Sequence, residues 1–541
     1  MKGAARPALA ARRRRLAWIA PPAARASSLL AFGAGVLTVF AFAPFTLTWL
    51  PAAALGLLFM LWQSASPGHA TRLGFAFGTG LFFTGVSWVY VALNTFGGMP
   101  APVAALGTAL FCLYLALFPA VAGFVAARWT APRSWARVLV AAAAWTIAEW
   151  ARSWGFSGFP WLAMGYAALP LASPAGPLGG FAPVGGVWLV SLAYALLAAS
   201  ATMGIEAAMR SDVRRVVGAA LTGLAVVGAG LALRPIAWTQ PTGSPLAVSL
   251  VQGNVRQDEK FDLALRDATF SLYVDLARAS RGRLIVLPES ALPAFADEVP
   301  VAVLRNLLDI AVARDGLLLT GLFTVEPPEP GQEGLRYYNS VLGIGGAMPQ
   351  VYRKRHLVPF GETIPLEPIV GWFIRSVLSI PLANQSAGAA AQPAFVVAHQ
   401  AIAVNICYED VFGSDIRPQA ESATILVNVT NDAWYGRSLA AEQHNQIAAM
   451  RALESGRPLL RATNTGITSF LGHDGREQAR LPWYTRGTLE LSVTGRNGLT
   501  PYVRYGDGLP LTLAAVLLIA ALALAQHQAT DRASRHQPLT G

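Results

Sequence analysis

The chain has 541 residues, of which 54% are hydrophobic and 13% charged, well below the roughly 25% charged fraction of soluble proteins. Its formal net charge is +11, but residues 1–238 hold three acidic side chains, whereas residues 239–508 hold 26 acidic and 23 basic ones. The hydrophilic part is thus slightly acidic, and this distribution excludes nucleic-acid binding as the reason for the positive charge.

Eight long apolar runs account for most of the remaining chain. Most approach the ~20 residues that an α-helix needs to cross a bilayer. The first two runs are so close together that they could form one helical hairpin in place of two separate spans. The sequence therefore predicts a polytopic α-helical membrane domain of about eight spans, seven in residues 1–238 and the eighth in residues 509–541. The runs lie near residues 28–45, 48–63, 73–93, 103–127, 137–151, 181–203, 216–233 and 509–526.

Basic residues occur in alternate connections between these runs, and such residues stay on the cytoplasmic side. The pattern predicts cytoplasmic termini and places residues 239–508 on the far side of the membrane. A cleaved signal peptide is the alternative for the N-terminus, but the charge alternation in later runs favours a retained anchor. The basic residues are Lys2, Arg6, Arg12 to Arg15 and Arg25, then Arg72, then Arg128, Arg133 and Arg137, then Arg210, Arg214 and Arg215, and finally Arg532 and Arg535.

Residues 239–508 alternate short β-rich runs with helical patterns, which predicts a layered α/β domain. Amphipathic spacing predicts helices over 259–280 and 299–314. An Ala-, Glu- and Gln-rich stretch predicts another over 440–455, stopped by Gly456. The predicted strands are 246–252, 284–287, 317–320, 341–344, 401–406 and 424–429.

Two of these strands end in chemically reactive side chains. Cys407 directly follows the strand 401–406, and Glu289 follows the strand 284–287. Between them, Lys354 lies in a basic run before an apolar turn. The other cysteine, Cys112, lies in an apolar run and is predicted to be a buried hydrophobe. Two cysteines so placed predict neither a disulfide framework nor a metal cluster.

A thiol, a carboxylate and an ammonium at one sheet edge would suit acyl chemistry. A free thiol has a pKa of about 8.5, so attack near neutral pH needs a proton acceptor or a nearby cation. Glu289 can accept the proton, and Lys354 can stabilise the thiolate and the tetrahedral oxyanion. Glu362 can pair with Lys354. The sequence alone shows no contact among these residues, so each has an ordinary alternative. Glu289 would be a turn residue, the basic run around Lys354 would be a solvated surface, and Cys407 would be an inert, packed thiol.

The segments around these residues resemble the nitrilase (carbon–nitrogen hydrolase) superfamily, and within it the apolipoprotein N-acyltransferase family. The resemblance covers nearly the whole chain and is carried by short motifs in both parts. In the hydrophilic part these are 251–254 (VQGN), 287–290 (LPES), 352–362 (YRKRHLVPFGE), 406–409 (ICYE), 431–436 (NDAWYG) and 457–464 (RPLLRATN); in the membrane part they are 149–152 (EWAR) and 158–161 (GFPW).

The resemblance implies an α-β-β-α sandwich with a Glu-Lys-Cys triad of Glu289, Lys354 and Cys407, and no cofactor. It implies that the thiol takes an acyl chain from a phospholipid as a thioester. The chain then passes to the amino group of the diacylglyceryl-modified N-terminal cysteine of an apolipoprotein, the last step of bacterial lipoprotein maturation. The expected location is the bacterial inner membrane, with the catalytic domain in the periplasm.

The resemblance also implies roles around the triad. Tyr408, Glu409 and Trp434 are expected to shape or contact the substrate pocket, and Glu362 to support Lys354. The chain departs from the family at Phe261, where a Trp is common. An aromatic lipid contact is retained there, but an indole N–H is not.

Other polar and apolar features allow two interpretations each. The apolar segment 368–382 is predicted to be a membrane-facing lid, and an ordinary core helix is the alternative. Three polar residues follow a strand: Asn428, Asn431 and Asp432. They are predicted either to contact substrate or to stabilise a turn. His444 is assigned to the surface or the packing of its helix. No zinc, phosphate-loop or serine-elbow motif occurs.

Two other functions remain open on the sequence. A membrane-anchored amidase would use the same triad and release the acyl group to water; the apolar spans and predicted lid favour transfer. A transporter with a soluble accessory domain is disfavoured, because the spans hold few ionisable residues.

Overall fold

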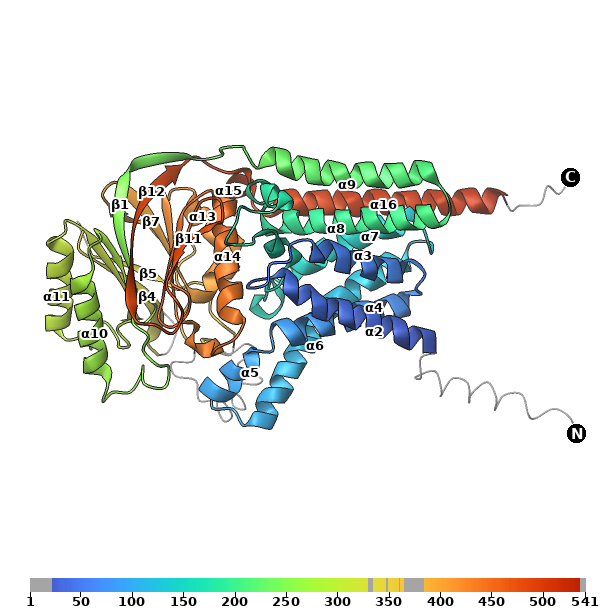
Figure 1. The fold of residues 1–541 in the computed structure, drawn as a ribbon. Coiled ribbons are helices and arrows are strands. Elements are labelled where there is room, and N and C mark those ends of the chain that lie inside the picture. The colour runs from blue at the N-terminus through green and yellow to red at the C-terminus, as the bar shows by residue number, and fades with distance from the viewer. Residues whose placement is uncertain (1–21, 329–333, 347–348, 360, 364–383, 536–541) are drawn as a thin grey trace, which may run out of the picture.

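The computed structural model describes residues 22–328, 334–346, 349–359, 361–363 and 384–535. The predicted lid at 368–382 and the N-terminal arginines before residue 22 lie outside these ranges. The molecule has a helical part and a part built from two β-sheets, side by side (Figure 1). The described chain begins and ends at the end of the helical part that is farthest from the sheets.

Each of the eight predicted apolar runs contains a helix. A short bent segment, α5 (Val89–Val91) with the π-helix η2 (Ala92–Phe96), follows the third of them. The eight helices are α2 (Pro22–Thr38), α3 (Leu50–Gln63), α4 (Pro67–Gly85), α6 (Ala101–Arg128), α7 (Trp135–Ala151), α8 (Ala182–Met209), α9 (Val213–Leu233) and α16 (Gly508–Arg535).

The predicted count of about eight spans is not confirmed. Within the described ranges, four helices are long and apolar enough to cross a membrane: Ala101–Arg128, Pro177–Met209, Val213–Leu233 and Gly508–His527. A fifth results if α4 and the segment after it, bent by 56°, count as one span. The others are short: α2 and α7 have 17 residues and α3 has 14, against the ~20 that a straight crossing takes.

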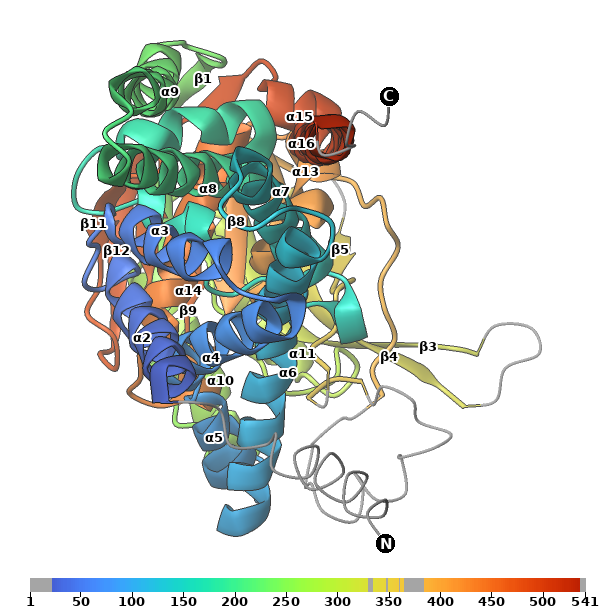
Figure 2. The ribbon, with the colours of Figure 1, turned by 90° about the vertical axis from the view of Figure 1, so that its right-hand side faces the viewer.

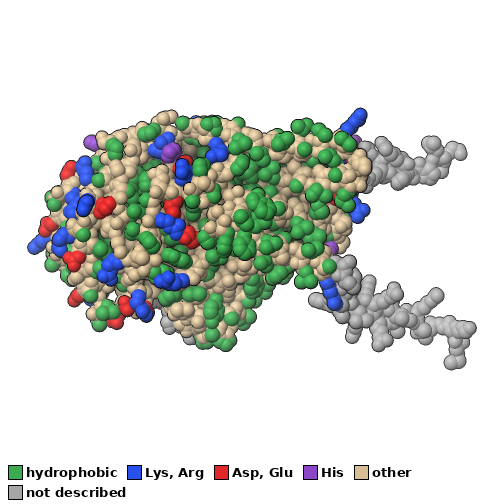
Figure 3. Space-filling model, in the orientation of Figure 1, with side chains coloured by type: hydrophobic (Ala, Val, Ile, Leu, Met, Phe, Trp, Pro, Cys, Tyr) green, Lys and Arg blue, Asp and Glu red, His purple; other side chains and the backbone are tan. Residues whose placement is uncertain are grey.

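The helices form one bundle, seen roughly end-on in Figure 2. Small residues allow α4 and α6 to approach each other closely. A Cβ on Gly74 would lie 2.2 Å from the carbonyl oxygen of Pro119, so only glycine permits this packing. In the view of Figure 3 the bundle surface is rich in apolar side chains and nearly free of charges between its two ends. Such an uncharged belt suits contact with lipid.

The second part contains two six-stranded sheets. Their strand orders are β12-β1-β2-β3-β4-β5 and β11-β10-β9-β8-β7-β6. The strands of the first are β1 (Gln240–Gln252), β2 (Leu284–Val286), β3 (Leu317–Glu326), β4 (Arg336–Ile344), β5 (Gln350–Arg353) and β12 (Gly487–Asn497); those of the second are β6 (Phe395–Val397), β7 (Gln400–Ile406), β8 (Ile425–Thr430), β9 (Leu459–Thr463), β10 (Ser469–Leu471) and β11 (Glu477–Arg480).

Helices cover both outer faces of the sheets. α10 (Arg266–Ala279) and α11 (Val301–Val312) lie on the side away from the bundle (Figure 1). α13 (Gly413–Ala420) and α14 (Ala440–Ser455) lie on the other side, where α14 contacts α8 and connects the sheets with the bundle. This is the four-layer α-β-β-α sandwich that the family resemblance implies.

All six predicted strands are present, and Gly456 ends α14 in the left-handed conformation with φ 63°. The helix predicted over 259–280 is wrong at its start, because it begins only at Arg266. Residues before it form turns, and these turns bury Lys260. The sequence analysis missed β5, β6 and β9 to β12, which are mostly short or irregular in their apolar spacing.

Candidate functional site

Cys407 lies at the carboxyl end of β7, where the strand turns into the short helix η6 (Cys407–Val411). Its backbone adopts a left-handed φ of 52°, a conformation that is uncommon for non-glycine residues. The side chain is 6% exposed. Burial, and then the negative charge of Glu289, raise the pKa of the thiol, whereas Lys354 lowers it. The free thiol is therefore neutral at pH 7 and needs a base before it can attack.

Glu289 follows β2, just as the sequence predicts, and it is buried. Its Oε1 accepts a hydrogen bond from Asn339 Nδ2 at 2.7 Å, and Lys354 Nζ lies 3.7 Å from the same oxygen. Asn339 is on β4, and its carbonyl oxygen also accepts from the main-chain N–H of Lys354 at 2.8 Å. Asn339 thus fixes the position of both the carboxylate and the ammonium.

The ammonium of Lys354 is held mainly by Glu362. The Nζ–Oε1 distance is 2.7 Å, and the lysine side chain is 1% exposed. Burial alone would lower the pKa of Lys354, but the carboxylates of Glu362 and Glu289 outweigh it and raise the pKa above its ordinary value. Lys354 is therefore protonated at neutral pH, and this is the charge state that stabilising an oxyanion requires.

A second buried lysine, which the sequence analysis did not single out, lies beside Glu289. Lys260 Nζ donates to the main-chain carbonyl oxygen of Glu289 at 2.9 Å, and Lys260 is 2% exposed. Burial lowers the pKa of Lys260 to about 8, although Glu289 and Cys407 act in the opposite direction. In the sequence, Lys260 stands directly before Phe261 in a segment expected to be a helix, and no role was predicted for it.

Tyr408 and Glu409 both lie in η6 but face different partners. Tyr408 donates its hydroxyl to the carbonyl oxygen of Gly158 at 2.8 Å. Glu409 accepts from Tyr352 Oη at 3.0 Å and from the main-chain N–H groups of Ile406 and Arg355 at 2.6 and 2.7 Å. Glu409 therefore connects the nucleophile turn to β5 through hydrogen bonds to the main chain and a tyrosine.

Phe261 and Trp434 are half-buried aromatics in two loops. The ring of Phe261 lies 6.3 Å from that of Phe323 on β3. Trp434, in the turn η7 (Asp432–Tyr435), packs edge-on against Phe96 of η2 at 6.2 Å. Trp434 therefore joins the loop after β8 to the bent segment of the helical part.

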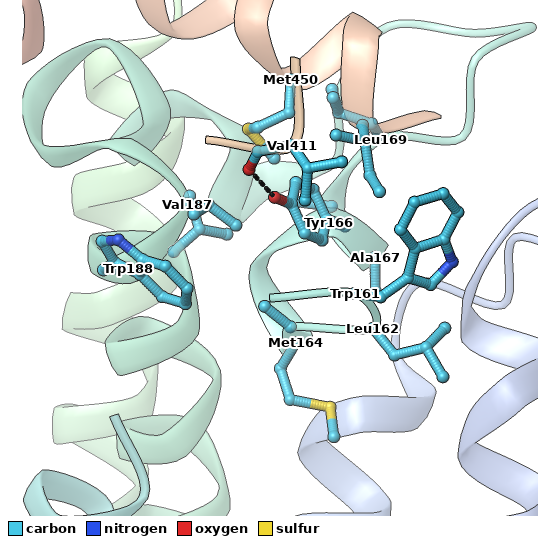
Figure 4. Close-up of a cluster of buried hydrophobic side chains, with 14 of the residues drawn as sticks. Trp161, Leu162, Met164, Tyr166, Ala167, Leu169, Val187, Trp188, Val411 and Met450 are labelled. Carbon is cyan, nitrogen blue, oxygen red and sulfur yellow. Dashed lines mark hydrogen bonds between the residues drawn. The ribbon is translucent and has the colours of Figure 1, made fainter. Parts of the chain in front are cut away.

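The loop 161–169 of the helical part packs directly against η6, the turn that begins with Cys407 (Figure 4). Tyr166 and Leu169 point towards Val411 of η6 and Met450 of α14. Tyr166 Oη donates to the carbonyl oxygen of Val411 at 3.4 Å. Trp161, fully buried, donates its indole N–H to Gln443 Oε1 of α14 at 2.7 Å. The helical part is thus packed around the turn that carries Cys407.

The structure therefore brings the predicted triad and Glu362 into one buried site. Such a site can deprotonate a thiol, hold a tetrahedral oxyanion and keep bulk water away. The sequence analysis assigned no role to Lys260 or Asn339. In the part of the chain that the structure describes, no group of three or more His, Cys, Asp or Glu side chains is arranged to hold a metal ion.

Comparisons with known proteins match both parts of the chain. The family model of the apolipoprotein N-acyltransferase N-terminal domain matches residues 34–200, and that of carbon–nitrogen hydrolases matches residues 225–498. The apolipoprotein N-acyltransferase of Nitrosomonas europaea is 45% identical over 91% of this chain and 96% of its own length. That of Ralstonia nicotianae is 41% identical over 90% and 92%. Among solved structures, a mutant of the Nesterenkonia AN1 amidase from the nitrilase superfamily aligns with 49% of this chain and 95% of its own, at 17% identity and a TM-score of 0.34.

Proposed function

The chain belongs to the apolipoprotein N-acyltransferase family, and we propose that it acylates the α-amino group of the diacylglyceryl-modified N-terminal cysteine of apolipoproteins, using a phospholipid as acyl donor. This would be the last step of lipoprotein maturation in a bacterial inner membrane. The observation that carries the proposal is the placement of Glu289 and Lys354 beside the buried Cys407. The full-length match to relatives of that name supports it.

In the first half-reaction, Glu289 takes the proton of the Cys407 thiol as the sulfur attacks the ester carbonyl of a phospholipid. Lys354 stabilises the oxyanion of the tetrahedral intermediate, and Glu362 keeps the ammonium in position. The carbon–oxygen bond of the ester then breaks, and Glu289 returns its proton to the leaving alkoxide. The products are a thioester on Cys407 and a lysophospholipid.

In the second half-reaction, the free amine of the acceptor attacks the thioester carbonyl. Glu289 takes a proton from the attacking nitrogen and passes it to the departing thiolate, so the thiol is restored and an amide is formed. An ester becomes a thioester and then an amide, and this sequence needs no nucleotide and no cofactor. Tyr408, Glu409, Phe261 and Trp434 support the turn or contact the acyl chains in this scheme.

We further propose that residues 1–238 and 509–541 form the membrane domain with about eight spans, and that residues 239–508 form the catalytic domain in the periplasm. The alternating basic loops support this orientation. It is also supported by the position of both ends of the described chain, on the side of the bundle opposite the sheets (Figure 1).

The proposal predicts a covalent intermediate that intact-protein mass spectrometry can detect. After incubation with phospholipid, the native protein should gain the mass of one acyl chain, and Cys407→Ala should not. Cys112→Ala, which removes the other cysteine, should still be acylated. Addition of a lipopeptide with a free amine should discharge the thioester to an N-acylated peptide. An amidase would release free fatty acid instead, and a transporter would keep its activity in Cys407→Ala.

A further inference from the structure

Four charged side chains form a closed ring beneath the nucleophile turn: Asp410 in η6, Asp432 in η7, His444 on α14 and Arg461 on β9. Each of them is at most 2% exposed. His444 Nε2 lies 2.7 Å from Asp410 Oδ1 and His444 Nδ1 lies 2.8 Å from Asp432 Oδ1. Arg461 Nη1 lies 2.7 Å from Asp410 Oδ2 and Nη2 lies 3.1 Å from Asp432 Oδ2. Each carboxylate therefore contacts both cations.

The hydrogen bonds determine the charge of the ring. A carboxylate oxygen only accepts, so both ring nitrogens of His444 donate and the side chain is an imidazolium. Burial and the nearby Arg461 oppose this form, but Asp410 and Asp432 raise the pKa of His444 above its ordinary value. Burial would also raise the pKa of Asp432, yet Arg461 and His444 lower it to about 2. Two carboxylates and two cations leave the ring with no net charge.

The ring reaches Cys407 by two routes. Asp410 lies three residues after Cys407 in the same short helix, and Asp432 follows β8, the parallel neighbour of β7. Arg461 Nη1 donates to Asn428 Oδ1 at 3.0 Å, and Asn428 Nδ2 donates to the carbonyl oxygen of Cys407 at 3.1 Å. The negative charge of Asp432 also acts on the Cys407 thiol itself.

We propose that His444 is a positioning residue whose positive charge neutralises Asp432 and Asp410, so that negative charge developing at Cys407 meets no uncompensated carboxylate. This proposal depends on the proposed function only for the expected change in the rate of thioester formation. Replacing a histidine that only fills space would leave the reactivity of Cys407 unchanged. In a buried site an unpaired carboxylate is costly and repels a thiolate strongly.

The charge can be separated from the packing by a double-mutant cycle. His444→Gln removes the cation and leaves Asp432 in excess, so iodoacetamide alkylation of Cys407 should shift to higher pH and thioester formation should slow at least tenfold. Asp432→Asn alone should shift alkylation to lower pH. The double variant should lie close to the native protein in both measurements. His399→Gln, in the exposed turn between β6 and β7, is the matched control.

Site-resolved mass spectrometry of the Cys407 peptide reports the alkylation without any lipid, and thermal unfolding confirms that each variant is folded. The proposal is overturned if the double variant is no better than His444→Gln, or if His444→Gln leaves the alkylation profile unchanged. If His444→Gln does not fold, the downward shift in Asp432→Asn alone supports the proposal, and its absence overturns it. The native protein could alkylate as expected and yet form no thioester. That result would contradict the proposed function but not the proposed role of His444.

Discussion

The hydroxyl of Tyr408 donates to the carbonyl oxygen of Gly158 at 2.8 Å, and this bond joins the residue next to the nucleophile to a loop of the helical part. A second connection lies close by. His356 Nε2 lies 2.8 Å from the carbonyl oxygen of Ser157, and the His356 ring stacks on Phe412 at 3.6 Å. The turn that carries Cys407 is therefore held by the helical part as well as by its own sheet. Changes in this loop should affect catalysis.

Tyr408→Phe should separate the contribution of the hydroxyl to stability from that of the aromatic ring. It removes one buried hydrogen bond and leaves Gly158 without its donor, which costs about 1–2 kcal/mol in unfolding free energy. Tyr408→Ala also removes the edge-on contact with Phe412 at 5.2 Å and should cost about 3–5 kcal/mol. Thermal unfolding of the purified protein in detergent measures both. Equal losses in the two variants would contradict a separate role for the hydroxyl.

Glu289→Gln should affect acyl transfer and thiol reactivity in opposite directions. Without the base, thioester formation should fall by about 10²–10⁴-fold. The charge of Glu289 raises the pKa of Cys407, so its loss lowers that pKa, and alkylation by iodoacetamide should become faster at pH 7–8. In the native protein the alkylation rate should still rise with pH above 9. Slower alkylation in Glu289→Gln would refute this electrostatic coupling.

Glu362→Gln should weaken the support of Lys354. Removing one partner of a buried ion pair typically costs about 3–5 kcal/mol, so both the unfolding temperature and the rate of thioester formation should drop. Glu362→Asp keeps the charge and should recover part of the rate. The matched control is Glu421→Gln, which removes an exposed partner of Arg417 and should cost no more than about 1 kcal/mol.

Phe261→Trp should retain acyl transfer, because the proposed role of this side chain is an apolar contact that tryptophan also provides. Phe261→Ala should raise KM for the phospholipid several-fold with a smaller change in kcat, since an aromatic side chain buries about 150–250 Å². Leu263→Ala, at a 75% exposed position of the same loop, serves as the control. A kcat loss in Phe261→Ala with unchanged KM would assign this side chain to the chemistry instead.

The apolar runs of the hydrophilic part predicted a layered α/β domain, and the family resemblance implied the α-β-β-α sandwich. The sequence placed Glu289 and Cys407 correctly at strand ends, since those ends coincide with changes in polarity. It failed over residues 259–265, where spacing suggested a helix but the chain instead turns to bury Lys260. The surface alternative for His444 is wrong, because the side chain is fully buried and contacts two carboxylates that the sequence did not place beside it.

The sequence by itself predicted Cys407, Glu289 and Lys354 as nucleophile, base and cation, because the motifs around them resemble those of the nitrilase superfamily. It also determined the division into apolar and hydrophilic parts, since composition decides which segments can enter lipid. Only the tertiary structure decided which charges meet. Lys354 lies next to Glu362 and Glu289, and Arg461 next to Asp410, across separations of up to 65 residues. Burial makes those pairings strong, and burial depends on packing that no local pattern contains.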